Sequence, residues 1–182
     1  MGKKSGPKPK QVNIELIEDF SSAPYKLMAE VRKKFHPDTE KARIALAWRK
    51  GTKADVDGHV VLGRCVKASE LQRELAVWDF VILLNHEVWN DKDFTVDKQS
   101  ALLDHELCHC EQVLDAEGDQ KKDSNDRLLW RTRRHDIEEF HSIVQRHGVW
   151  KKDLERFAQA LLKQRENPTL FPQTAAASQV LQ

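Results

Sequence analysis

Apolar residues at helical spacing mark the first regular element of the chain. Leu27, Val31 and Phe35 recur every four residues with charged residues between them, a spacing that places their side chains on one face of an α-helix. Pro37 cannot continue a helix, and it also restricts the backbone of the residue before it. The pattern therefore predicts an amphipathic helix over residues 24–35.

The following segments show the alternation and the continuous apolar runs typical of β-strands. Residues 42–48 alternate larger and smaller side chains, and residues 60–66 follow an Asp57-Gly58 turn signal, so we expect these two strands to form a hairpin. A short helix is predicted over 69–75 and a strand over 79–84. The apolar strand 79–84 suits either the centre of a sheet or its edge, where it would bind an extended substrate by β-augmentation.

A longer helical pattern runs from Thr95 to Leu114. At about 100° per residue one stripe is apolar, and a second face combines apolar residues with two histidines and a glutamate. The apolar stripe is Leu103, Leu107, Cys110 and Leu114, and the second face is Leu102, His105, Glu106, His109 and Val113. A polar loop (115–126), a strand (127–134) and helices over 136–146 and 151–163 follow. This order predicts an α+β fold with a short mixed or antiparallel sheet packed against the 95–114 helix and the C-terminal helices.

Composition sets the boundaries of the folded part. Of the 182 residues 40% are hydrophobic, and 30 Lys and Arg against 29 Asp and Glu leave a net charge of +1, so no global field recruits nucleic acid or membrane. Residues 1–11 are Lys-rich and 166–182 are rich in Pro, Ala, Ser, Thr and Gln, so both are expected to be flexible tails of one domain over 12–165.

Cysteine usage and hydropathy predict the location of the protein. Its three cysteines form neither an even disulfide framework nor paired CxxC elements, which favours a reducing compartment. No apolar run approaches the roughly 20 residues that a bilayer span requires. We therefore expect a soluble cytoplasmic protein; its oligomeric state is not indicated by the sequence.

The 95–114 helix carries the motif H-E-x-x-H as His105, Glu106 and His109. Side chains four residues apart lie on one helix face, so two imidazoles can hold one zinc ion while the glutamate reaches a water bound to it. The face between Leu102 and Val113 is expected to be buried, where an unpaired carboxylate costs several kcal/mol. A metal removes that cost, so the pattern predicts a Zn²⁺ site.

A catalytic zinc needs a third protein ligand. Asp115 lies ten residues after His105, as the third ligand of metzincins does, but that arrangement uses a glycine where this chain has Gln112, and we expect no break in the helix there. Glu138 and Glu139, on the predicted 136–146 helix, would complete a gluzincin-like site.

His135 is the other candidate for the third ligand. It ends the predicted basic strand and precedes Asp136, a good N-cap for the next helix, so its side chain is expected to project at a strand-to-helix corner.

Several runs of sequence together resemble the putative phage metallopeptidase family. They are Ala101-Leu-Leu-Asp-His-Glu-Leu-Cys-His-Cys110, His135-Asp-Ile-Glu-Glu-Phe140, Arg146-His-Gly-Val-Trp150, His36-Pro-Asp38 and Ala42-Arg-Ile-Ala-Leu-Ala-Trp-Arg49. The likeness covers most of residues 20–150 and extends more distantly to SprT-like minimal zincins, although Phe140 follows His135 by five residues and not by the four of that pattern. The resemblance implies a small zincin-like domain with His105, His109 and His135 as zinc ligands and Glu106 as general base. For a phage-encoded protein the expected location is the host cytoplasm.

These observations predict a zinc-dependent peptidase acting on protein or peptide substrates. One alternative is a non-catalytic zinc-containing binding or regulatory protein, which Glu106 argues against because structural zinc sites have no use for a base. Another is a zinc hydrolase of a different substrate class, such as a nuclease. The arginines of 127–134 and the Lys-rich tail would supply nucleic-acid contacts, although charged strand faces are commonly only solvated.

Overall fold

The computed structural model describes residues 13–166. The predicted tails, 1–11 and 166–182, therefore lie outside the described residues apart from Glu166. The chain divides into two compact units, described over 13–133 and 134–166, and each is treated by itself. No helix of the described residues combines the length and the apolar composition needed to cross a membrane.

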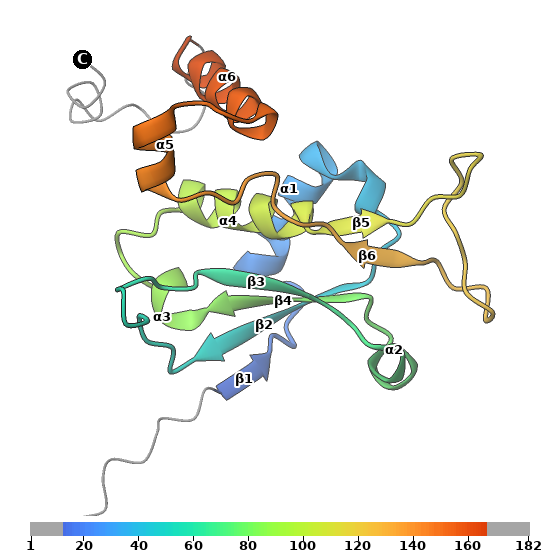
Figure 1. Ribbon diagram of the computed structural model, residues 1–182. Helices are drawn as coiled ribbons and strands as arrows, with labels where there is room; N and C mark the ends of the chain where they lie inside the picture. The colour runs from blue at the N-terminus through green and yellow to red at the C-terminus, as the bar shows by residue number, and fades with distance from the viewer. Residues whose placement is uncertain (1–12, 167–182) are drawn as a thin grey trace, which may run out of the picture. The chain divides into compact units, whose positions relative to one another are not determined.

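The first unit is a mixed α/β structure built on a small sheet (Figure 1). In chain order its elements are β1 (Asn13–Leu16), α1 (Ala23–Phe35), the 3₁₀ turn η1 (Pro37–Thr39), β2 (Ile44–Lys50), β3 (Gly63–Lys67), α2 (Glu70–Ala76), β4 (Phe80–Asn85), α3 (His86–Trp89), α4 (Val96–Cys108), β5 (Cys110–Gln112) and β6 (Trp130–Thr132). The sequence pattern missed the short elements β1 and α3. The predicted α+β class and the mixed sheet are confirmed.

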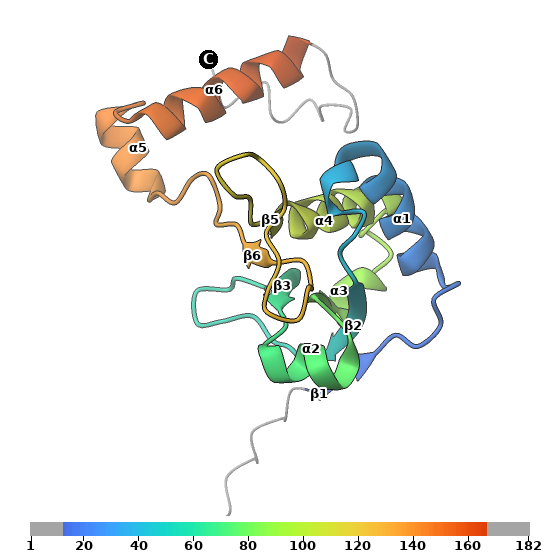
Figure 2. The same ribbon diagram turned by 90° about the vertical axis from the view of Figure 1, so that its right-hand side faces the viewer.

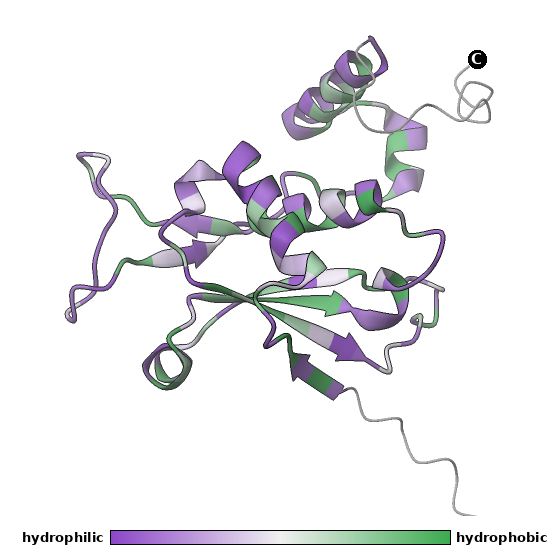
Figure 3. Cartoon of the chain, turned by 180° about the vertical axis from the view of Figure 1, so that it is seen from behind, coloured by the Kyte–Doolittle hydropathy of each residue, from purple (hydrophilic) through white to green (hydrophobic). Residues whose placement is uncertain are grey.

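The sheet has the order β1-β2-β4-β3, with β2 parallel to β4 and the other two pairs antiparallel. The predicted hairpin between the second and third strands is therefore wrong, because β4 lies between them. β4 is the most continuously apolar strand, with Phe80, Ile82 and Leu84 fully buried, and a strand of that composition is best buried with partners on both sides (Figure 3). The option of substrate binding at an edge formed by 79–84 is thereby excluded.

Helices α1 and α4 pack side by side and close the core over the sheet (Figures 1 and 2). The predicted first helix is confirmed, and it ends at Phe35 directly before the His36-Pro37 step. From α1, Met28 and Val31 join Leu103 and Leu107 of α4 in one cluster with the buried face of β2 and β4. The core thus holds α4, the helix that carries the candidate site described below, against β2 and β4.

Helix α4 is shorter than the pattern predicts, because it ends at Cys108 instead of continuing to Leu114. The next residues leave the helix to form β5, whose backbone pairs with β6 from Trp130 to Thr132. Cys110 remains buried as expected, whereas Leu114 is 50% exposed and does not belong to the apolar stripe. Tertiary pairing has here overridden a local helical period.

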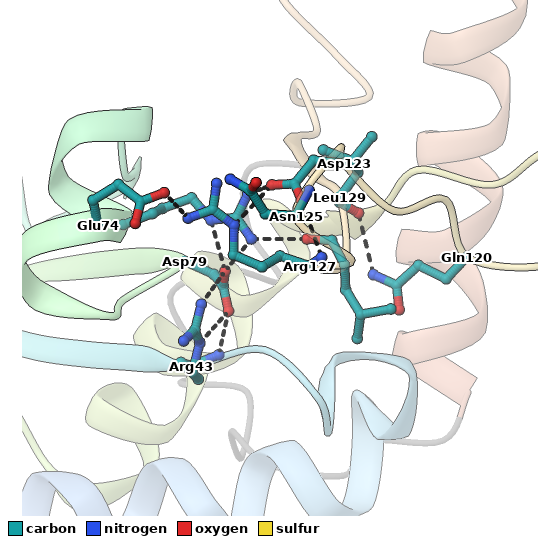
Figure 4. Close-up of polar contacts among 10 residues, drawn as sticks. Arg43, Glu74, Asp79, Gln120, Asp123, Asn125, Arg127 and Leu129 are labelled. Carbon is teal, nitrogen blue, oxygen red and sulfur yellow. Dashed lines mark hydrogen bonds and ion pairs between the residues drawn. The ribbon is translucent and has the colours of Figure 1, made fainter.

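The segment between β5 and β6, residues 113–129, forms an arm held to the sheet by a buried charge network (Figure 4). Asp79, 3% exposed, accepts hydrogen bonds from Arg43 and from Arg73, which is itself 7% exposed. Arg73 also donates to the carbonyl oxygen of Leu128 (2.9 Å) and lies 3.6 Å from a carboxylate oxygen of Asp123, both in the arm. The network connects the arm to α2 and to the start of β4.

The second unit contains α5 (His141–His147) and α6 (Lys152–Glu166). The predicted helix over 136–146 starts later than expected, and Phe140 occupies the N-cap position that was assigned to Asp136. Glu139 accounts for part of the difference, because its carboxylate accepts the backbone N–H of Phe140 (2.9 Å) and pairs with Lys151 (3.3 Å). Side-chain contacts of this kind compete with helical hydrogen bonds.

Candidate metal centre

Helix α4 brings His105 and His109 together at its C-terminal end. Their ring centroids are 5.2 Å apart, the ring planes are nearly perpendicular at 84°, and one ligand nitrogen of each lies within 4.8 Å of the other. His109 is the C-cap residue, but its backbone is still right-handed helical (φ −75°, ψ −16°). The four-residue spacing therefore keeps its geometry although the helix stops one residue earlier.

The return of β6 orients the His109 ring. Nδ1 of His109 lies 2.7 Å from the carbonyl oxygen of Arg133, and the N–H of Arg133 donates to the carbonyl oxygen of His109 (3.0 Å). A carbonyl can only accept, so Nδ1 carries the proton and Nε2 has the lone pair that a metal needs. Backbone acceptors of this kind commonly fix metal-binding histidines.

Glu106 is the buried member of the motif. The residue is 3% exposed, and its Oε2 has no hydrogen-bond partner among the described residues. Burial raises the pKa of the carboxyl, while nearby His109 and a backbone hydrogen bond from Cys65 act in the opposite direction. An unpartnered buried oxygen costs free energy unless a further group completes the site. The pair of imidazoles next to it has the donor chemistry of a zinc centre, so the residues present fit that ion.

Gly63 of β3 makes room for this carboxylate. A Cβ at Gly63 would stand 2.7 Å from Oε1 of Glu106 and 3.1 Å from Cδ1 of Leu102. The strand can therefore approach α4 only because residue 63 has no side chain. Sequence reasoning missed both Gly63 and the carbonyl of Arg133, since neither belongs to a local motif.

Two of the carboxylates considered as a third ligand are held by other contacts. The helix does not continue to Asp115, contrary to the expectation from the sequence. Asp115 lies in the arm, where its Oδ1 accepts the N–H groups of Glu117 (3.1 Å) and Asp119 (2.8 Å). The Glu139 carboxylate is engaged by Phe140 and Lys151, and these contacts lower its pKa.

Neither Glu138 nor Glu139 lies on a helix, so the expected gluzincin-like placement is wrong. His135 follows the last strand of the first unit by three residues, in an irregular segment and not at the strand-to-helix corner that the sequence suggested.

Residues 19–161 match the family model described as putative phage metallopeptidase. The chain belongs to this family. No curated protein and no solved structure matches the chain. The family description indicates a metal-dependent peptidase, which agrees with a pair of histidines that could hold a metal ion beside a buried carboxylate.

Proposed function

We propose that the chain is a zinc-dependent peptidase in which His105, His109 and His135 bind the ion and Glu106 is the general base. The observation that carries the proposal is the buried Oε2 of Glu106, which no group of residues 13–166 hydrogen-bonds, beside two histidines on one helix turn. A purely structural site would close around its ion with a fourth ligand and would gain nothing from a buried base. The non-catalytic alternative therefore has less support.

Chain connectivity supports His135 as the third ligand. Arg133 contacts His109 through both its N–H and its carbonyl oxygen, which places the end of the first unit next to the histidine pair. Each residue spans at most about 3.3–3.6 Å, so the Cα of His135 lies within about 7 Å of that of Arg133. The competing carboxylates of Asp115 and Glu139 already accept other hydrogen bonds.

The chemistry assigns separate tasks to the ion and to the side chains. A zinc ion held by three histidines would lower the pKa of a water molecule and polarise the peptide carbonyl. Oε2 of Glu106 would take a proton from the attacking water and then deliver it to the leaving amine nitrogen. In the metal-free chain, burial raises the pKa of this carboxyl, which favours its acceptance of a proton. The Nδ1 bond of His109 to Arg133 would fix the orientation of the ring and the tautomer whose Nε2 faces the ion.

A nucleic-acid substrate receives little support from two of the arginines of the 127–134 segment. Arg127 pairs with Asp123 (2.9 Å) and with Glu74, and Arg131 pairs with Glu111 (2.6 Å). Positive charge satisfied by carboxylates is less available to phosphates. We therefore keep protein or peptide as the proposed substrate class.

The test compares the wild-type chain with Glu106→Gln by mass-spectrometric profiling of cleaved peptides, with zinc content measured on both. Glu106→Gln should keep the metal and lose about 10²–10⁴-fold in turnover, because the carboxylate acts on the water and does not bind zinc. Glu117→Gln, an exposed glutamate in the arm, is the matched control and should behave as wild type. Equal turnover in Glu106→Gln would refute the mechanism.

A further inference from the structure

A second group of ligand-type side chains lies on α4, offset by one residue from the histidine pair. Asp104 and Cys108 are four residues apart on α4, and His36 reaches them from the end of α1. One ligand atom of each of the three lies within 4.8 Å of those of the other two. Nε2 of His36 is 2.6 Å from Oδ1 of Asp104.

The position of His36 follows from the end of α1. Pro37 stops the helix, and His36 takes a non-helical backbone (φ −129°, ψ 52°) as its C-cap. The residue is 8% exposed, so its ring is held in place between α1 and α4 and keeps little rotamer freedom. Asp104 is only partly buried and Cys108 is exposed, so these two side chains can adjust around a fixed imidazole.

The three donors form a set that zinc-class cations prefer. Imidazole nitrogen, carboxylate oxygen and thiolate sulfur all bind Zn²⁺, at about 2.0–2.3 Å. Ligand atoms around a tetrahedral ion of that size stand roughly 3.3–3.8 Å apart. To reach this spacing, Nε2 of His36 and Oδ1 of Asp104 would separate from their 2.6 Å hydrogen bond by roughly 1 Å, and Cys108 would rotate to bring its Sγ in from its present position within 4.8 Å. The i, i+4 spacing of Asp104 and Cys108 is the same spacing that brings His105 and His109 together.

We propose that His36, Asp104 and Cys108 form a second site for a zinc-class cation. It lies about 100° around α4 from the histidine pair, one residue earlier along the helix. An ion there would connect α1 to the helix that carries His105, Glu106 and His109, and it would leave a coordination position open toward solvent. The thiolate makes the site selective for zinc-class metals over Mg²⁺ or Ca²⁺. This site does not depend on the proposed peptidase activity.

Cobalt substitution tests the proposal, because only the second site contains a thiolate. The metal-free full chain is titrated with Co²⁺, and we expect two bound equivalents. One of them should give a thiolate-to-cobalt charge-transfer band in the near ultraviolet, and excess Zn²⁺ should remove it. Cys108→Ser should lose this band, and its affinity for the corresponding Co²⁺ equivalent should fall at least tenfold. Asp104→Asn, which preserves side-chain size, should lower the affinity for the same equivalent at least tenfold. Cys110→Ala, a change at a thiol outside the proposed site, should retain the band.

The double variant His105→Ala/His109→Ala separates this proposal from the peptidase proposal. This variant should no longer bind the Co²⁺ equivalent that gives no thiolate band, and it should still bind the equivalent that gives the band. A wild-type chain that binds one equivalent with the band would support the second site and contradict the histidine site. Absence of the band in wild type, or its persistence in Cys108→Ser, would overturn the proposal. The cluster would then be a His36–Asp104 hydrogen bond that joins two helices.

Discussion

Substitution of Gly63 by alanine tests how closely β3 controls the position of Glu106. The new Cβ would lie 2.7 Å from Oε1 of Glu106 and 3.2 Å from its Cδ, whereas ordinary contact begins at 3.4 Å. Gly63 does not have a left-handed backbone, so alanine introduces no dihedral strain of its own. The perturbation is thus a steric one, directed at the carboxylate.

The size of the required movement follows from these distances. Restoring contact needs a shift of about 0.7 Å, the difference between 3.4 and 2.7 Å. Glu106 is 3% exposed and cannot swing into solvent, so either its carboxylate or strand β3 must move. Overpacking of this kind costs about 1–3 kcal/mol of stability. A misplacement near 1 Å can lower catalysis about 10²-fold, so we expect kcat/KM to fall about 10–100-fold while zinc content is unchanged.

The assay combines peptide hydrolysis, zinc content and the free energy of unfolding in urea. Gly118→Ala is the control, because a Cβ there meets nothing within 4 Å but the positive φ (+92°) imposes strain. The free energy of unfolding of Gly118→Ala should fall by about 1 kcal/mol, and its activity should be unchanged. In a double-mutant cycle, Glu106→Ala removes the closest clash and leaves only the 3.1 Å approach to Cδ1 of Leu102, so Gly63→Ala should cost less stability in that background than in wild type.

Unchanged activity and stability in Gly63→Ala would refute the reasoning. So would an equal stability cost of Gly63→Ala with and without Glu106→Ala, because the carboxylate would then not be the group that the alanine displaces.

Three further predictions concern the buried network, the third ligand and the pH dependence. Asp79→Ala leaves two arginines, one of them buried, without their carboxylate, and it should lower the free energy of unfolding by about 3–5 kcal/mol in urea titrations. The control Glu15→Ala breaks an exposed pair and should lower the free energy of unfolding by less than about 1 kcal/mol. Similar values for both variants would contradict the network. His135→Ala should lower zinc affinity sharply and abolish hydrolysis, whereas Glu139→Ala should keep most of the metal; the reverse result in metal analysis would assign a two-histidine, one-glutamate site. Burial raises the pKa of Tyr25, the only tyrosine, above 10.0, so its stabilising contribution is fully present below about pH 10 and is lost as pH rises through the raised native pKa. The tyrosinate absorbance of the native chain should titrate at a higher pH than that of the chain in urea, and coincident curves would show that Tyr25 is not buried.

Local periodicity determined the elements that depend on nearby residues. The first helix, the apolar strand β4 and the helix that carries H-E-x-x-H were predicted, because side-chain spacing and a proline act within a few residues. The four-residue spacing also brought His105 and His109 together without any knowledge of the fold, since helix geometry alone places them on one face.

Tertiary structure decided what depends on partners far away in the chain. β2 and β3 are close in sequence, but the parallel pairing of β2 with β4 separates them, because a strand as apolar as β4 is stabilised by neighbours on both edges. The end of α4 was likewise set by the hydrogen bonds between Cys110–Gln112 and Trp130–Thr132, which local propensity cannot include.

The same distinction holds within the candidate site. The residue types and spacing of the motif predicted Glu106 as the base. They could not show that its Oε2 is buried with no partner among the described residues, or that Gly63 lies against its other oxygen. Burial is a property of all the segments that surround a group, and here β3 and α4 are brought together by packing between residues about 40 positions apart. The sequence by itself therefore determined which groups we propose for the chemistry, because their types and spacing are local, and the packing of strand against helix decided the environment that surrounds them.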